Sequence, residues 1–181
     1  MRILPLILLA VLPASAWADT CPPLDTGARQ AALAPHYKAL KASKNERGAA
    51  GPNDEIWKIW KQAPDAKAQA MLDVGIGQIR AADYAGAQAA LEDLVAYCPA
   101  YAEGWNQLAF AKFLAGDLDG ALADLEITLE LLPNHYAALA GRGLTLMRMG
   151  RPELAHNALR EALEYHPWMH ERHMLPAEEK I

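Results

Sequence analysis

The stretch that decides the fold is residues 102–135, AEGWNQLAFAKFLAGDLDGALADLEITLELLPNH. Apolar residues recur in it at intervals of three and four, the period of an amphipathic α-helix. Gly116 and Asp117 interrupt the pattern halfway, and Pro133 ends it, as helix stop signals do. The stretch therefore predicts two helices joined by a tight turn.

The same pattern occurs three times along the chain, in residues 68–101, 102–135 and 136–169. The prolines that mark this period are Pro64, Pro99, Pro133 and Pro167, separated by 35, 34 and 34 residues. Small residues recur at the eighth position (Gly75, Ala109, Gly143) and at the twentieth (Ala87, Ala121, Ala155). Two helices cross closely only where their facing side chains are small, so each repeat is predicted to be a tight helical hairpin.

Composition favours the same fold class. Residues 19–181 hold 33 alanines and 21 leucines but only two valines, Val74 and Val95. Alanine and leucine are strong helix formers, whereas strands favour β-branched residues. The sequence therefore predicts an all-α protein.

The repeats resemble the tetratricopeptide repeat family. The residues of the second repeat that match the family pattern are Trp105, Leu108, Ala109, Gly116, Asp117, Ala121, Leu125, Leu129 and Pro133. The resemblance covers residues 68–169 and implies a right-handed α-solenoid of helix-turn-helix repeats. The chain departs from the pattern at Arg142, where leucine is expected, and at Gln78 and Lys112, where an aromatic residue is expected.

The segments that flank the repeats are predicted to cap them. Residues 19–67 are interpreted as an N-terminal arm and a degenerate helical hairpin, a fourth repeat stacked on the other three. Its first helix is expected over 28–44, interrupted by Pro35, and a breaker over 48–52 is expected before a short helix capped by Asn53 or Asp54. Residues 170–181 are expected to form a C-terminal capping segment.

Residues 1–18 have the three parts of a secretory signal peptide: Arg2, an apolar run over 3–12, and the small-residue site Ala16-Trp17-Ala18. Cleavage near Ala18 predicts a periplasmic or secreted protein. The remaining chain has 16 basic and 22 acidic residues, a net charge of −6, which argues against nucleic-acid binding. No later stretch approaches the roughly 20 apolar residues that span a bilayer, so the mature chain is not expected to insert.

Cys21 and Cys98 are the two cysteines of the chain. An oxidising compartment favours a disulfide between them, which would tie the N-terminal arm to the end of the first repeat. Free thiols or intermolecular pairing are the alternatives. There is no CxxC motif, and Ala18-Asp19-Thr20 before Cys21 is not a lipoprotein processing site, so neither redox catalysis nor lipid anchoring is expected.

The family resemblance implies a concave groove lined by the first helix of each repeat. The residues predicted to line it and bind a partner are Leu72, Ile76, Ile79, Arg80, Asn106, Phe110, Phe113, Leu144, Met147 and Arg148. This mostly apolar lining suits a peptide or an amphipathic helix of another protein. In the alternative interpretation, the protein's own N-terminal helix fills the groove.

The family's binders of chaperone tails hold a terminal carboxylate with a clamp of lysine, asparagine and arginine. The corresponding residues here do not supply that clamp; they are Leu72, Ile76, Gln107, Ala137 and Gly141. Charge is also uneven along the chain: residues 29–67 carry +4, residues 68–135 carry −8, and residues 136–181 are neutral. The acidic middle would either be neutralised by the basic N-terminal hairpin or steer a basic partner.

A histidine-rich C-terminal segment suggests a second possible role. His166, His170 and His173 have the spacing of one helix face, and histidine with the thioether of Met174 suits copper. Pro167 breaks that geometry, so the favoured interpretation is a capping segment without metal, and no cofactor is expected. His170, His173 and Met174 remain the candidate metal ligands.

The sequence therefore predicts a non-catalytic interaction scaffold or chaperone-like adaptor of the cell envelope. An enzyme is disfavoured because residues 19–181 contain one serine, Ser43, and no clustered acid-base group. The alternatives are a periplasmic copper-handling protein and, more narrowly, an assembly factor for envelope complexes, as in cytochrome c maturation. The sequence does not indicate the partner or the oligomeric state.

Overall fold

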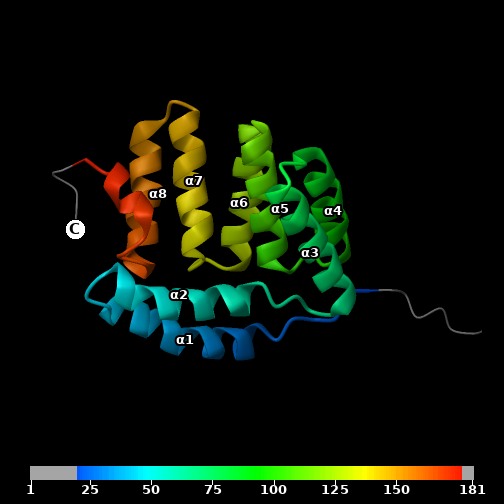
Figure 1. Cartoon of the computed structure of the whole chain (residues 1–181), viewed down its shortest axis with the longest axis horizontal. Coiled ribbons are helices and arrows are strands. Elements are labelled where there is room, and N and C mark those ends of the chain that lie inside the picture. The colour runs from blue at the N-terminus through cyan, green and yellow to red at the C-terminus, as the bar shows by residue number, and fades with distance from the viewer. Residues whose placement is uncertain (1–19, 177–181) are drawn as a thin grey trace, which may run out of the picture.

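The computed structural model describes residues 20–176 and shows eight α-helices and one short 3₁₀ helix, with no strand in that part of the chain. The predicted all-α fold is confirmed (Figure 1). The predicted signal peptide, residues 1–18, lies outside the described residues. Within residues 20–176, no helix combines the length and apolar character that a bilayer crossing requires.

Six helices form an upright stack of three hairpins (Figure 1). They are α3 (Ala66–Arg80) and α4 (Tyr84–Tyr97), α5 (Ala102–Ala115) and α6 (Leu118–Leu131), and α7 (Tyr136–Arg148) and α8 (Pro152–Tyr165). The chain before them forms α1 (Thr26–Ala42) and α2 (Glu46–Trp60), and η1 (His170–Met174) follows them. Each stacked hairpin falls within one of the three predicted repeats, except that α3 begins two residues earlier.

The turns inside the three hairpins share one backbone conformation. The residue at the same place in each turn has a positive φ: Ala82 at 58°, Gly116 at 91° and Gly150 at 72°. Glycine adopts this left-handed region without strain, whereas alanine does so at a cost of about 1 kcal/mol. In the first two turns the next residue, Asp83 or Asp117, caps the second helix by accepting a backbone N–H.

Within each repeat, the two helices are held by a small residue that faces a leucine. A Cβ added at Gly75 would lie 2.5 Å from Leu91 Cγ, and one added at Gly143 would lie 2.8 Å from Leu159 Cγ. Both leucines are fully buried. The eighth position of the repeat is therefore small because the leucine at position 24 occupies the space.

The N-terminal hairpin was predicted to continue the stack as a fourth repeat, and this prediction was wrong. Figure 1 shows α1 and α2 lying crosswise under the ends of the upright helices. Trp60, Ile56 and Leu33 are buried in one cluster with Leu132, at the end of α6, and Tyr136, at the start of α7. The hairpin lies crosswise because its apolar face packs against these helix ends and not against the side of α3.

The helix breaks predicted in this hairpin were also wrong. α1 runs through Pro35, and α2 runs from Glu46 through Gly51 and Pro52 to Trp60, capped by Asn45 rather than by Asn53 or Asp54. A proline inside a helix removes one backbone hydrogen bond. Burial of Ala49, Ile56 and Trp60 along one face offsets that loss.

Hydrogen bonds between distant segments anchor the hairpin across the stack. The Tyr37 hydroxyl donates to the Asn134 carbonyl at 2.6 Å, and the Trp168 indole N–H donates to the Ser43 carbonyl at 2.8 Å. At the other end of the hairpin, the Arg29 guanidinium donates to the carbonyls of Ile59, Trp60 and Gln62, at the end of α2. The Tyr37 and Trp168 bonds join the hairpin to the region between α6 and η1, whereas the Arg29 bonds hold α1 to the end of α2.

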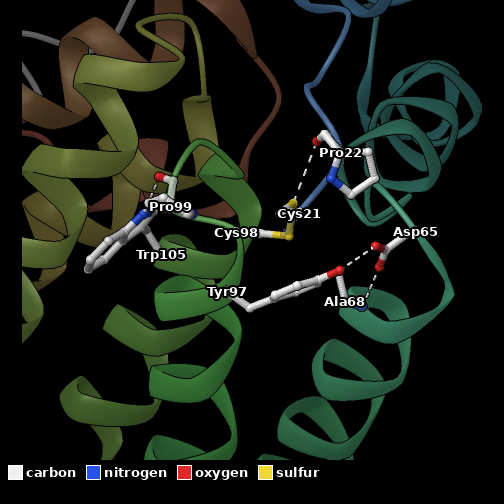
Figure 2. Close-up of a disulfide and its surroundings, with 8 residues drawn as sticks. All are labelled: Cys21, Pro22, Asp65, Ala68, Tyr97, Cys98, Pro99 and Trp105. Atoms are coloured by element: carbon white, nitrogen blue, oxygen red, sulfur yellow. Dashed lines mark hydrogen bonds between the residues drawn. A yellow bond between two sulfur atoms is a disulfide. The ribbon is translucent and has the colours of Figure 1, made fainter. Parts of the chain in front are cut away.

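A disulfide joins Cys21 to Cys98, the pairing that the sequence analysis favoured, with 5.1 Å between the Cα atoms (Figure 2). It ties the arm before α1 to the end of α4. Nearby, the Tyr97 hydroxyl donates to Asp65 Oδ2 at 2.7 Å, while the other carboxylate oxygen caps α3. These hydrogen bonds lower the pKa of Asp65.

The C-terminal segment covers the last repeat. Met169 and Leu175 are buried against Leu139, Leu159 and Leu163, so the apolar edge of α7 and α8 is closed. Residues 177–181 of the predicted capping segment lie outside the described residues.

Candidate functional site

A groove of about 510 Å³ lies between the N-terminal hairpin, the first helices of repeats 2 and 3, and the C-terminal segment. α2 contributes Glu46, Ala49, Ala50, Asn53 and Trp57; α5 contributes Asn106, Gln107, Ala109, Phe110 and Phe113; α7 contributes Tyr136, Ala137, Ala140, Gly141, Leu144 and Thr145. The remaining lining residues are Leu125 and the segment that holds His166, Trp168, Met169, His170 and Glu171. The groove is thus built by α2, α5, α7 and the C-terminal segment, with one residue from α6.

Aromatic side chains dominate the wall of this groove. Phe110 is 46% exposed although it is large and apolar, and Phe113, Trp57 and Trp168 are partly exposed beside it. Burying one such side chain against a ligand contributes about 1.5–3 kcal/mol. The groove therefore has the apolar surface that a protein segment needs for binding.

One end of the groove is closed where the C-terminal segment meets the start of α2. Arg172 in η1 forms an ion pair with Glu46 of α2 at 2.6 Å, and its guanidinium lies 5.4 Å from the centroid of the Trp168 ring. The bond from Trp168 to Ser43 reinforces the same closure. α2 therefore forms a wall of the groove and does not fill it, which resolves the two interpretations left open by the sequence.

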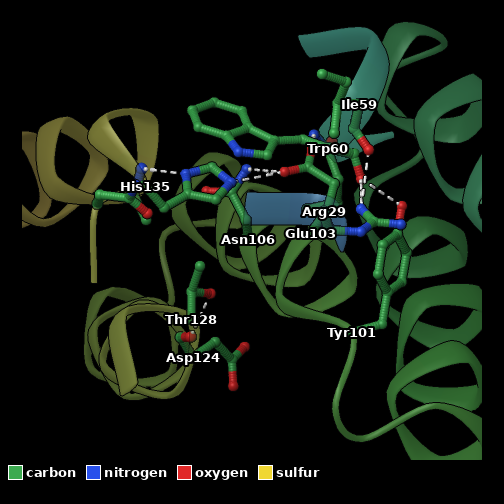
Figure 3. A network of polar contacts seen from close by, with 12 residues as sticks. Arg29, Ile59, Trp60, Tyr101, Glu103, Asn106, Asp124, Thr128 and His135 are labelled. Atoms are coloured by element: carbon green, nitrogen blue, oxygen red, sulfur yellow. Dashed lines mark hydrogen bonds and ion pairs between the residues drawn. The ribbon is translucent and has the colours of Figure 1, made fainter. Parts of the chain in front are cut away.

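A buried polar network stands behind the wall formed by α5 (Figure 3). The carboxylate of Glu103 is 2% exposed and accepts hydrogen bonds from Asn106 Nδ2 at 3.2 Å and from Gln107 Nε2 at 2.6 Å. His135 Nδ1 accepts the backbone N–H of Ala138, so the ring hydrogen is on Nε2, 2.9 Å from Glu103 Oε2. Three donors therefore satisfy one buried carboxylate.

Trp60 completes this network from the hairpin side. Its ring stacks on the His135 ring, with 3.7 Å between centroids and 13° between planes. The stack fixes the imidazole, which caps α7 and bonds Glu103. The hairpin thereby sets the position of the side chains that form the polar part of the groove wall.

His166 lies in the groove at the end of α8. Its ring is edge-on to Tyr136, with 5.0 Å between centroids, and its Nδ1 accepts the backbone N–H of Trp168. Burial lowers the pKa of His166 to about 4. The side chain is therefore neutral near pH 7.

The structure brings together four of the ten residues predicted to line a binding groove: Asn106, Phe110, Phe113 and Leu144. Leu72 is instead fully buried in the core cluster that holds Leu108 and Ala111 of α5, because repeat 2 packs on that face of α3. Ile76 and Ile79 pack against the same cluster, and Arg80 is exposed at the end of α3.

Arg148 and Met147 lie at the end of α7 and do not line the groove. The Arg148 guanidinium lies 4.6 Å from the centroid of the Phe113 ring and donates to the Phe113 carbonyl at 2.7 Å. Met147 is partly buried. Arg148 therefore fixes the position of a groove residue from outside the groove.

Sequence reasoning missed the groove residues of α2 and of the C-terminal segment, above all Trp57 and Trp168. Trp57 precedes the three repeats, and Trp168 lies at the end of the third, after α8, so neither is on the first helix of a repeat. The tryptophans themselves were the available signal, because large aromatic residues are frequent in binding surfaces.

The candidate metal ligands lie on η1. The rings of His170 and His173 are 5.9 Å apart between centroids, and Met174 is exposed next to them. His166 is buried at the end of α8 and does not share their face. In residues 20–176, no group of three or more histidine, cysteine, aspartate or glutamate side chains is placed to hold a metal ion.

The six-helix stack has the fold of tetratricopeptide repeats, as the sequence resemblance implied. No protein-family model matches the chain. A TPR repeat-containing protein of Rhizobium etli is 26% identical over 131 residues, which cover 72% of this chain and 64% of that protein. The chain therefore spans less than two thirds of the length of this curated relative.

Solved structures share the fold at low sequence identity. The first TPR domain of Spaghetti (RPAP3), bound to the HSP90 peptide SRMEEVD, has a TM-score of 0.57 and 20% identity over 58% of this chain and 83% of that one. The TPR2B domain of yeast Sti1 in a pHsp70 complex has a TM-score of 0.55 and 21% identity, covering 56% and 81%. YrrB, described as a TPR protein with an unusual peptide-binding site, has a TM-score of 0.54 and 21% identity, covering 78% and 79%.

Proposed function

We propose that this protein is an exported, periplasmic scaffold or chaperone-like adaptor that binds a peptide or helix of another envelope protein in its groove. The observation that carries the proposal is the open aromatic groove, in which Phe110 is 46% exposed. The three neighbours named above are described by the peptides or peptide-binding sites they carry, which supports peptide binding by this fold.

A non-catalytic role agrees with the chemistry of the groove. The buried carboxylate behind its wall, Glu103, accepts hydrogen bonds from three donors, and the buried histidine of its lining, His166, accepts a backbone N–H. Neither is arranged beside a hydroxyl or thiol nucleophile, and the two cysteines are joined to each other. The proposed export rests on the predicted signal peptide. The copper-handling and assembly roles stay predictions.

Affinity capture from a native envelope extract tests the proposal. The wild type should retain a partner, and the double substitution Phe110→Ala with Phe113→Ala should reduce the amount captured at least about tenfold. Burial of each phenylalanine against the partner contributes about 1.5–3 kcal/mol to binding. Leu154→Ala is the matched control, since Leu154 is 52% exposed on α8 and does not line the groove.

The comparison is valid only if all variants keep the wild-type circular-dichroism spectrum and melting temperature within a few degrees. A partner that the double variant retains as well as the wild type does would exclude the groove and move the site to another surface. Photocrosslinking from a residue-110 probe to the captured protein then gives a direct measure of which segment occupies the groove.

A further inference from the structure

Two amide side chains of the groove wall are held in one orientation by a buried carboxylate. The Asn106 and Gln107 side chains line the groove, and both point their NH₂ groups at the buried Glu103 carboxylate. A carboxylate only accepts hydrogen bonds, so this contact fixes the orientation of both amides. The oxygen atoms of Asn106 and Gln107 are left to accept hydrogen bonds from a ligand.

Two carboxylates lie at the edge of the groove, and its described lining contains neither lysine nor arginine. Glu46 is paired with Arg172, but the Glu171 side chain makes no ion pair or hydrogen bond with another residue of the described chain. His166 adds no positive charge at neutral pH because burial depresses its pKa. The described lining therefore carries one carboxylate, Glu171, that is not paired with a basic residue of the described chain.

The aromatic residues of the groove favour the same ligand chemistry. The faces of tryptophan, tyrosine and phenylalanine rings attract lysine and arginine side chains, and Trp57, Phe110 and Trp168 line this groove. The fold already uses this contact on three lining rings: Lys61 lies over Trp57, Arg148 over Phe113 and Arg172 over Trp168. Phe110 is the exposed ring for which no such contact is present in the described chain. Residues 68–135, which carry −8, would also speed the approach of a basic partner.

We propose that the groove selects an apolar segment that carries a lysine or arginine, whose cationic group lies between Glu171 and the amide oxygens of Asn106 and Gln107. This inference rests on the proposed function and specifies its ligand. The ligand class is opposite in charge to the peptide SRMEEVD bound by the Spaghetti domain, which ends in acidic residues. Here Gln107, Ala137 and Gly141 replace residues of the clamp that would hold a terminal carboxylate.

Three fluorescein-labelled peptides of roughly twelve residues test the inference by fluorescence anisotropy. They share the same leucine and phenylalanine positions and carry lysine, glutamine or glutamate at the others. The lysine peptide should bind about tenfold more tightly than the glutamine peptide, and the glutamate peptide should bind most weakly. The advantage of lysine should shrink as salt is raised.

Glu171→Gln should reduce the preference for lysine over glutamine at least about threefold and leave binding of the glutamine peptide unchanged. Glu164→Gln is the matched control, because it removes the same charge from an exposed site on α8 outside the groove. Phe110→Ala should weaken all three peptides. Lysine binding that survives Phe110→Ala would be general attraction to an acidic protein and would overturn the inference.

The outcomes separate this inference from the proposed function. Peptides that bind with dependence on Phe110, but with equal affinity or with a preference for glutamate, overturn the charge preference and leave groove binding intact. If no peptide binds with dependence on Phe110 while the envelope partner is also retained by the groove variant, the proposed function itself fails.

Discussion

The N-terminal hairpin and the three repeats are all pairs of helices, but different contacts hold them in place. In repeats 1 and 3, Gly75 and Gly143 face Leu91 and Leu159, one contact at two copies of the same repeat position. The hairpin is held by side chains that occur once, such as Tyr37 and Trp60, against partners far along the chain. The stack is therefore encoded by local repetition, and the hairpin is encoded by single long-range contacts.

Removing the disulfide should have the largest effect on stability, and it should act through the N-terminal hairpin. The double substitution Cys21→Ala with Cys98→Ala should lower the free energy of unfolding by about 4 kcal/mol, because the bond closes a loop between residues 77 apart. Urea denaturation measures the change. Wild type in reducing agent should match the double variant. Equal stability of the oxidised and reduced forms would show that the hairpin needs no covalent tie.

Gly75→Ala should destabilise the repeat stack and lower the free energy of unfolding by about 3 kcal/mol. The new Cβ would lie 2.5 Å from Leu91 Cγ in the fully buried core, so α3 and α4 would have to separate. Gly77→Ala, two residues along the same helix, is the matched control. No atom lies within 4 Å of its added Cβ, so it should stabilise the protein by up to about 1 kcal/mol. Destabilisation by both variants would refute the packing argument.

His166 should make the end of α8, where the stack meets the C-terminal segment, sensitive to pH. Burial lowers its pKa in the folded state to about 4, below the unfolded value of about 6.5, so the unfolded chain binds the proton first. Stability from this residue is therefore present above pH 6.5 and lost as the pH falls toward 4. Between pH 7 and 5 the loss should be about 2 kcal/mol.

Urea denaturation of the wild type and of His166→Gln at both pH values checks this expectation. The variant should keep the rest of the pH dependence but lack the contribution of His166. Parallel curves for the two proteins would mean that the imidazole is hydrated in the folded state.

Ala82→Gly should have the smallest effect on stability, because it gives the turn of repeat 1 the glycine that repeats 2 and 3 already have. Ala82 has a φ of 58° at the turn position that Gly116 and Gly150 occupy in repeats 2 and 3. Glycine there removes backbone strain and should stabilise the protein by about 1 kcal/mol. The reverse change, Gly116→Ala, should destabilise it by a similar amount. A lower melting temperature for Ala82→Gly would contradict the expectation.

The stack could be predicted from the sequence because its contacts repeat. The glycine and alanine positions, the prolines and the turn residues Asp83 and Asp117 recur at one period, so each copy supports the assignment of the others. The crosswise hairpin could not be predicted, because Tyr37 and Ser43 find their partners 97 and 125 residues away and no second copy repeats those contacts.

The groove could be predicted only in part for the same reason. Asn106, Phe110, Phe113 and Leu144 were found from their repeat positions on the first helices, whereas Trp57 precedes the repeats and Trp168 follows the last helix of the third. Leu72 was misplaced because the repeat position alone does not tell whether a neighbouring helix covers it. The orientation of the Asn106 and Gln107 amides depends on Glu103 and His135, a pair that meets only in the folded chain.

The long-range anchors of the hairpin also set an order of events during synthesis. α1 and α2 are synthesised before the segments that hold them, because the Asn134 carbonyl and Tyr136 follow α6 and Trp168 follows α8. Until then, Leu33, Ile56 and Trp60 lack the surface that buries them. α1 and α2 therefore reach their final position only after the later helices are made, and a nascent chain that stops after α6 has two complete repeats but lacks part of the surface on which its N-terminal hairpin packs.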